Sequence, residues 1–127
     1  MNYQGTIIEE SLDDKSSVLK QVKILSTKVE AVVEKHQTPW LKQRTLHKVE
    51  ILDQRAEAIA KALSLALENT HHSWYADYKN STTHYIIFPN KIFKIDRQSK
   101  EQYRKAKEYG IALGIPGYQV DFSPEIK

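Results

Sequence analysis

Side chains that can take part in chemistry gather between residues 71 and 88. This segment holds three of the five histidines, one of the two tryptophans and three of the seven tyrosines. Their spacing matches no motif with a defined mechanism, because the chain has no His-x-His, no His-Glu-x-x-His, no Gly-x-Ser-x-Gly elbow and no phosphate-binding glycine loop. The pattern therefore indicates where a site could lie without indicating a reaction.

The clearest candidates in this segment lie on two expected strands, 74–79 and 84–88. Alternation puts Tyr75, Asp77 and Lys79 on one face of the first strand. If the strands pair around residues 80–83, Lys79 lies roughly opposite His84 or Thr83, and Asp77 lies near Ile86. An acid, a phenol and an ammonium on one face can bind a small molecule, or they can form a solvent-facing ladder of opposite charges. Both interpretations stay open.

A second candidate row comes from the alternating segment 40–51. His47 shares its parity with Leu41, Val49 and Ile51, so we expect it to face the apolar side. It is then either a hydrogen-bonded core histidine or a general base that lines a cavity. Together the two rows predict a small-ligand site made of Gln43, Thr45, His47, Tyr75, Asp77 and His84.

The opposite row of the same segment interleaves basic and aromatic side chains, namely Trp40, Lys42, Arg44 and Lys48. Single-stranded nucleic acids bind such rows through base stacking and phosphate pairing. Basic residues on a strand are also typical of a solvated face or a protected edge. The chain lacks the signature of an RNA-recognition strand, so nucleic-acid binding is the weaker alternative.

Metal and cofactor sites are not expected. The chain has no cysteine, which excludes thiolate ligands and disulfides. His71 and His72 are adjacent, and neighbouring residues of a strand point to opposite faces, so the pair cannot chelate one ion there. We interpret them as part of a polar connection after a helix.

Two segments predict helices. Residues 54–68 are rich in strong helix formers, with Ile59, Leu63, Ala66 and Leu67 on one face and Asp53 as the expected N-cap. In residues 99–113, Ser99 and Gln102 have capping-box spacing. The apolar stripe of this second helix is Tyr103, Ala106, Gly110 and Leu113, and Gly114 and Pro116 stop it.

The remaining segments predict strands, so the fold class is α+β. Expected strands cover 5–10, 18–33, 40–51, 74–79, 84–88, 91–95 and 118–122. Residues 40–122 follow the ferredoxin-like βαββαβ order, with an extra hairpin at 91–95 and N-terminal strands added. We expect an antiparallel sheet with both helices on one face. Its other face is then solvated, covered by the N-terminal strands or buried in a partner subunit.

Length and composition predict one soluble domain, residues 1–127. The 127 residues are 40% hydrophobic and 28% charged with a net charge of +3, which is ordinary globular composition. No apolar run approaches the ~20 residues that span a bilayer, and the first residues lack a signal peptide's pattern. With no cysteine, a cytoplasmic location without membrane contact is the expectation.

Four short sequence segments are similar to segments of other proteins: residues 3–12 (YQGTIIEESL), 38–43 (TPWLKQ), 74–80 (WYADYKN) and 109–116 (YGIALGIP). In these segments the chain resembles a group of small uncharacterised prokaryotic proteins. The resemblance implies a free-standing single-domain protein. It implies no activity and transfers no site residue.

The function expected from the sequence is a small cytoplasmic binding protein, homodimeric and without catalysis of its own. This expectation depends on the absence of catalytic spacings and on a sheet face that needs covering. The first alternative is an enzyme or small-ligand receptor that uses the six-residue site. The second is a weak binder of single-stranded nucleic acid.

Overall fold

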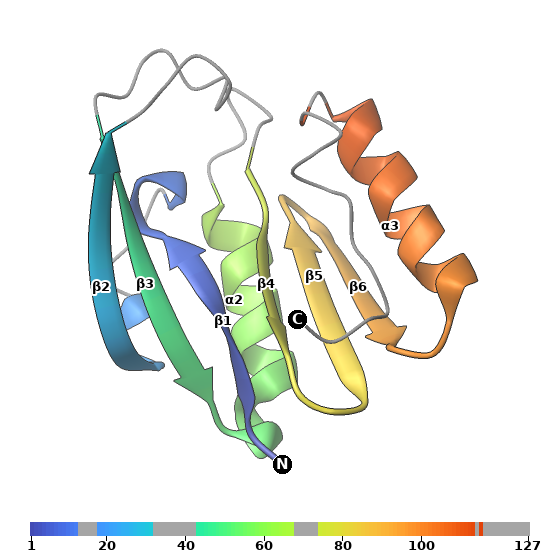
Figure 1. The fold of residues 1–127 in the computed structure, drawn as a ribbon, viewed down its shortest axis with the longest axis horizontal. Helices are drawn as coiled ribbons and strands as arrows, with labels where there is room; N and C mark the ends of the chain where they lie inside the picture. Colours follow the sequence, from blue (N-terminus) through green and yellow to red (C-terminus); the bar gives the residue numbers. More distant parts are fainter. Residues whose placement is uncertain (13–17, 32–42, 68–73, 114, 116–127) are drawn as a thin grey trace.

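The computed structural model describes residues 1–12, 18–31, 43–67, 74–113 and 115. These residues form an α+β fold with a six-stranded antiparallel sheet and two α-helices (Figure 1). The strands are β1 (Tyr3–Ile8), β2 (Lys23–Ala31), β3 (Gln43–Ile51), β4 (Ala76–Lys79), β5 (Thr83–Phe88) and β6 (Lys91–Asp96). The helices are α2 (Ala56–Ala66) and α3 (Lys100–Ala112), with 3-10 turns η1 (Glu9–Ser11) and η3 (Asp53–Arg55).

The strand order is β2-β3-β1-β4-β5-β6, and every neighbouring pair is antiparallel. A ferredoxin-like core would insert β5 between β3 and β4. Here β1 occupies that place, with Tyr3 opposite Ile51 of β3 and Gln4 opposite Lys79 of β4. The predicted ferredoxin-like order is therefore wrong for the described strands. The expected strand 118–122 lies outside the described residues.

Gly5 explains how β1 fits between two strands. A Cβ atom at Gly5 would lie 2.0 Å from the carbonyl oxygen of Asp77 and 2.6 Å from Cα of Tyr78. Only a residue without a side chain allows backbones to approach this closely. On either side of Gly5, Tyr3 and Ile7 are buried in the core, so the strand is fixed by packing as well as by pairing.

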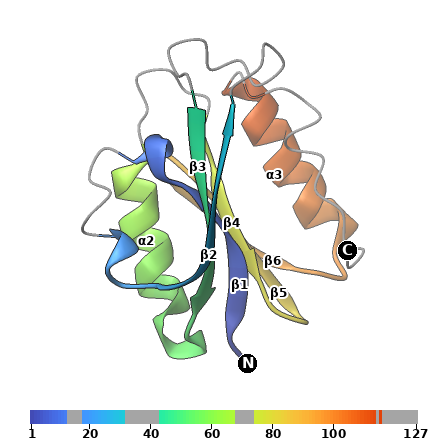
Figure 2. The ribbon, with the colours of Figure 1, turned by 60° about the vertical axis from the view of Figure 1, so that its left-hand side comes forward.

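The two helices cover opposite faces of the sheet, which corrects the prediction of one covered face (Figure 2). Strand β5 shows the cause, because its apolar residues are buried in both parities. Tyr85 and Ile87 pack in the cluster that includes α2, whereas Ile86 and Phe88 pack in the cluster that includes α3. A strand with two apolar faces needs a layer on each side.

The helices themselves agree with their sequence patterns. In α2 the predicted stripe is buried, and in α3 Tyr103, Ala106 and Gly110 are buried. Ser99 caps α3, since its side chain accepts from the N–H of Gln102, but the Gln102 side chain accepts from the N–H of Asp96 instead of completing a capping box. Asp53 does not cap α2, because it is the first residue of the turn η3 and Arg55 is at the N-cap position.

Candidate functional site

The structure divides the six predicted ligand-site residues between the two faces of the sheet. Thr45 and His47 share the parity of Val49, which packs in the cluster with α2. Asp77 and His84 lie on the α3 face, and Tyr75 packs there with Phe88 at a ring-centroid distance of 6.0 Å. The backbone of Gln43 lies in β3, and its side chain is outside the described residues. These residues do not line one shared pocket.

On the α3 face, His84 joins two strands and a helix. Its Nε2 lies 2.8 Å from Oδ2 of Asp77, and its Nδ1 lies 3.1 Å from the hydroxyl of Tyr103 on α3. A carboxylate only accepts hydrogen bonds, so Nε2 carries a proton. In the neutral imidazole Nδ1 then accepts from the Tyr103 hydroxyl. The Tyr103–His84–Asp77 chain thus has a defined direction.

The burial of Tyr103 and His84 limits the chemistry that this hydrogen-bonded series can perform. Tyr103 is 3% exposed and His84 is 4% exposed. Burial raises the pKa of the Tyr103 phenol, and the nearby positive charge of Arg97 opposes this increase. An acid, an imidazole and a hydroxyl in series can move a proton, as in hydrolase triads. Here the hydroxyl is too deeply buried for a substrate to reach it. The hydrogen bonds from Tyr103 through His84 to Asp77 therefore attach α3 to the sheet.

On the α2 face, His47 makes a similar chain with different partners. Its Nδ1 lies 2.9 Å from Oγ1 of Thr27 on β2, and its Nε2 lies 3.1 Å from Oε1 of Glu9. His47 is 7% exposed, whereas Thr27 is exposed. Because Thr27 and His47 are directly opposite in the β2–β3 pair, the contact is a cross-strand pair. This geometry agrees with the interpretation of His47 as a hydrogen-bonded core histidine.

Glu10 holds the turn η1 against β3 beside that chain. Its Oε1 accepts from the backbone N–H of Thr45 at 2.6 Å, and its Oε2 accepts from the Thr45 hydroxyl at 2.8 Å. Both oxygens of one carboxylate therefore bind one residue, and bonds to a charged acceptor are the stronger kind. Thr45 is a structural partner of Glu10 in this arrangement.

The predicted nucleic-acid row is described only in part. Lys48 is exposed and lies opposite Thr6 of β1 and Ser26 of β2, on the sheet face away from α2. Trp40 and Lys42 lie outside the described residues, and so does the side chain of Arg44. Binding of nucleic acid by this row stays a prediction.

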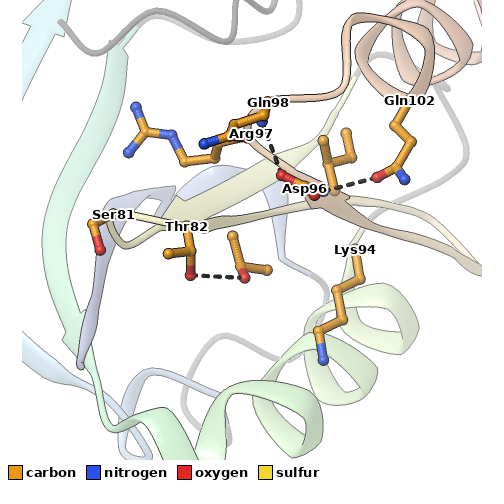
Figure 3. A pocket seen from close by; sticks show the side chains of 9 residues that line it. Ser81, Thr82, Lys94, Asp96, Arg97, Gln98 and Gln102 are labelled. Atoms are coloured by element: carbon orange, nitrogen blue, oxygen red, sulfur yellow. Dashed lines mark hydrogen bonds between the residues drawn. The ribbon is translucent and has the colours of Figure 1, made fainter.

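A hollow of about 510 Å³, lined mostly by polar residues, opens beside the start of β5 and the end of β6 (Figure 3). Its lining is Ser81, Thr82, Thr83, Lys94, Ile95, Asp96, Arg97, Gln98 and Gln102. Asp96 is held there, because its Oδ1 accepts from the N–H of Gln98 at 2.9 Å and its own N–H donates to Gln102. No predicted site residue lines this hollow.

Neither a metal-ligating cluster nor a membrane-spanning helix is present in the described part of the chain. It contains no group of three or more His, Cys, Asp or Glu side chains that could hold a metal ion. No helix within it has the length and apolarity that a membrane crossing requires.

The partners of the two histidines come from distant parts of the chain. Glu9 precedes His47 by 38 residues, and Tyr103 follows His84 by 19. The only sequence signal for Tyr103 was its place in the apolar stripe of a helix, which gives no hint of His84. The acidic pair Glu9 and Glu10 is visible in the sequence, but nothing near it indicates strand β3.

Comparison with known proteins gives no match: no protein-family model, no curated protein and no solved structure is similar to this chain.

Proposed function

We propose that this chain is a small cytoplasmic interaction protein that forms a homodimer through the free edge of β2 and has no catalysis of its own. The observation that carries the proposal is the exposure of that edge. Strand β2 is the outermost strand on its side of the sheet, and eight of its nine residues are exposed. A long open edge offers unpaired backbone groups to another strand.

The side chains of β2 add apolar surface to this edge. Ile24, Leu25 and Val29 are 42%, 41% and 55% exposed. The opposite edge differs, because Ile95 of β6 is buried and Phe93 packs in the cluster under α3. Of the two sheet edges, β2 is the one that leaves large apolar side chains in water, so it is the one that gains from a partner.

Two features of β2 limit how a partner strand can pair. The register shifts between Ile24 and Ser26, which marks a bulge, and the strand carries two lysines, Lys23 and Lys28. Bulges and lysines both discourage pairing at a sheet edge. Pairing is therefore expected after the bulge, over 26–31. A second copy fits such an edge through a two-fold axis perpendicular to the sheet, which keeps equivalent faces on the same side.

Charge selects the register of this pair. An axis at Lys28 would place two lysines opposite each other, which is unfavourable. An axis at Val29 places Val29 opposite its own copy and places Lys28 opposite Glu30 of the second copy, twice. We propose this register, since it buries the most exposed apolar side chain of the strand and pairs opposite charges.

Size-exclusion chromatography with light scattering tests the proposal. We expect the wild-type chain to be dimeric at micromolar concentration and Val29→Lys to weaken the dimer by about tenfold or more, which corresponds to a loss of 1.4 kcal/mol or greater. Leu65→Lys is the matched control, because Leu65 lies on α2 and is 77% exposed. This variant also replaces an exposed apolar side chain by lysine, but away from β2, so it should leave the dimer intact.

A charge exchange tests the register separately. Lys28→Glu should weaken the dimer, because it places two glutamates opposite each other, and Lys28→Glu combined with Glu30→Lys should restore it. A wild-type chain that stays monomeric at micromolar concentration would overturn the proposal. So would a dimer that Val29→Lys and Leu65→Lys affect equally.

A further inference from the structure

Three lysines, Lys28, Lys48 and Lys79, form a diagonal across the sheet face opposite α2, on strands β2, β3 and β4. Figure 1 shows this face with α2 behind the sheet, and neither α2 nor α3 lies over β1, β2 or β3 on that side. We infer that these three residues, the lysine track, bind the phosphate backbone of a single-stranded nucleic acid. The track lies within one chain, so it does not depend on the proposed dimer.

The strand register determines the diagonal. Lys48 is directly opposite Thr6 of β1, and Gln4, which lies two residues before Thr6 on the same face, is directly opposite Lys79. In the other direction, Lys28 is displaced from Lys48 by one strand and two residues. Strands lie about 4.8 Å apart and alternate residues about 6.8 Å apart, so the Cα atoms of successive track lysines are separated by about 8 Å and about 12 Å.

The ammonium groups of the track are available to an anion. Lys28 and Lys48 are exposed and Lys79 is half-buried. No ion pair in the described part of the chain involves any of the three. Of the basic row predicted from the sequence, Lys48 alone belongs to the track. Clustered cations without acidic partners are the electrostatic pattern that attracts a polyanion.

The acidic residues of the same face lie beside the track. Glu50 accepts from the side chain of Asn2 at 3.3 Å, and Asp77 binds His84 at 2.8 Å. Glu30 lies beyond the end of the track on β2. A polyanion that follows the diagonal therefore meets the lysines, whereas one that crosses the face in another direction meets the acids.

Neutral hydrogen-bonding side chains lie between the lysines. Thr6 and Gln4 of β1 and Ser26 of β2 are exposed, and within the described ranges their side chains have no hydrogen-bond partner. Serine, threonine and glutamine side chains bind phosphate oxygens without reading the base sequence. The strands β1, β2 and β3 carry no described aromatic side chain on this face, so the bases have no ring to stack on. Binding therefore depends on the phosphates.

The shape and polarity of the face favour a single strand over other polyanions. Protein surfaces that bind membranes add apolar side chains to their lysines, but the described side chains between the track lysines are polar. Helix α3 stands beside the track on the same side of the sheet (Figure 2), which restricts the approach of a rigid duplex. A flexible strand can follow a diagonal of about 20 Å beside that helix.

Fluorescence anisotropy of a labelled oligothymidylate of about eight nucleotides tests the track in the wild-type chain. Each phosphate that a lysine neutralises contributes about 0.7 to the slope of log K against log salt concentration. Two or three contacts predict a slope between about −1.4 and about −2. The range includes two contacts because, in the proposed dimer, Lys28 also faces Glu30 of the second copy.

Lys48→Gln and Lys79→Gln remove track charges away from the proposed dimer edge. We expect each to reduce the magnitude of the slope by about 0.7, and the double variant to bind about tenfold more weakly or worse at about 50 mM salt. Lys61→Gln is the matched control, because Lys61 is exposed on α2, on the other side of the sheet, and it should change neither quantity. Light scattering of the same variants shows separately whether the dimer persists.

The wild-type chain alone can contradict the inference, whatever the variants do. No binding of the oligonucleotide at about 50 mM salt would overturn it. Equal losses of affinity in Lys48→Gln and Lys61→Gln would also overturn it. So would an equal or higher affinity for a duplex of the same length, for polyglutamate or for phosphatidylserine vesicles, since the lysines would then serve another kind of partner.

Discussion

The hydroxyl of Tyr103 lies 3.1 Å from Nδ1 of His84, so a buried hydrogen bond connects α3 to β5. Tyr103→Phe removes the hydroxyl and leaves a buried imidazole nitrogen without this partner. We expect the free energy of unfolding to fall by about 1–3 kcal/mol, the usual cost of an unsatisfied buried group. Urea denaturation followed by circular dichroism measures this change.

Tyr109→Phe is the control for that experiment. Tyr109 lies on the same helix, and its ring packs on Phe88 at a centroid distance of 5.0 Å, a contact that phenylalanine retains. We expect a much smaller loss of stability. Equal losses in the two variants would show that the His84 contact contributes nothing specific.

The sequence predicted local structure well, because local structure follows from local patterns. The stripes of α2 and α3, the cap at Ser99 and the hairpin around residues 80–83 were all predicted, and the structure confirms them. The inward position of His47 was also predicted from alternation alone. These features depend on residues only a few positions apart.

The arrangement of those elements was predicted wrongly for an identifiable reason. The segment Tyr85–Phe88 has apolar residues in both parities, which indicates a strand buried on two sides. The predicted ferredoxin-like fold has helices on only one face of the sheet, so it leaves one apolar face of this strand uncovered. Likewise, no local pattern indicates that β1 pairs with β3 and β4, since those contacts join residues that are 38 or more positions apart.

The close approach of β1 and β4 gives the second prediction. Gly5→Ala places a Cβ against backbone atoms of Asp77 and Tyr78, which cannot rotate away. We expect the free energy of unfolding to fall by about 3 kcal/mol, at the upper end of the usual cost of overpacking. Thr6→Ala changes the exposed neighbour on the same strand and should cost less than about 1 kcal/mol. Denaturation curves of the two variants distinguish this outcome from a simple loss of strand propensity, in which Gly5→Ala would be neutral or stabilising.

The carboxylate of Glu10 gives the third prediction. Glu10→Gln keeps the shape of the side chain but removes the charge and one acceptor from the pair that binds Thr45. We expect a loss of about 2 kcal/mol, because hydrogen bonds to charged groups are worth about 1.5–3 kcal/mol. Glu57→Gln, on the exposed face of α2, makes the same change without those bonds. If thermal unfolding shows equal losses for both variants, the two bonds to Thr45 do not stabilise the fold.

The buried phenol of Tyr78 gives a prediction about alkaline pH. Burial, and then the neighbouring Tyr85 and Tyr3, raise the pKa of Tyr78 far above its ordinary value. An unfolded tyrosine ionises near pH 10, so above about pH 10 the unfolded state loses a proton that the folded state keeps. Stability must therefore fall as the pH rises past 10, by up to about 1.4 kcal/mol per pH unit for this group.

Tyr78→Phe separates this effect from the other tyrosines. The variant loses the hydrogen bond from the hydroxyl to the carbonyl oxygen of Ala56, 2.5 Å long, and at pH 7 it should be about 1 kcal/mol less stable than the wild type. Above pH 10 its stability should fall less steeply, because one ionisation of the unfolded state is gone, while Tyr85 and Tyr103, whose pKa values burial also raises, still contribute. The two stability curves should therefore converge between pH 10 and 11 in urea denaturation, and parallel curves would mean that Tyr78 ionises as readily in the fold as in water.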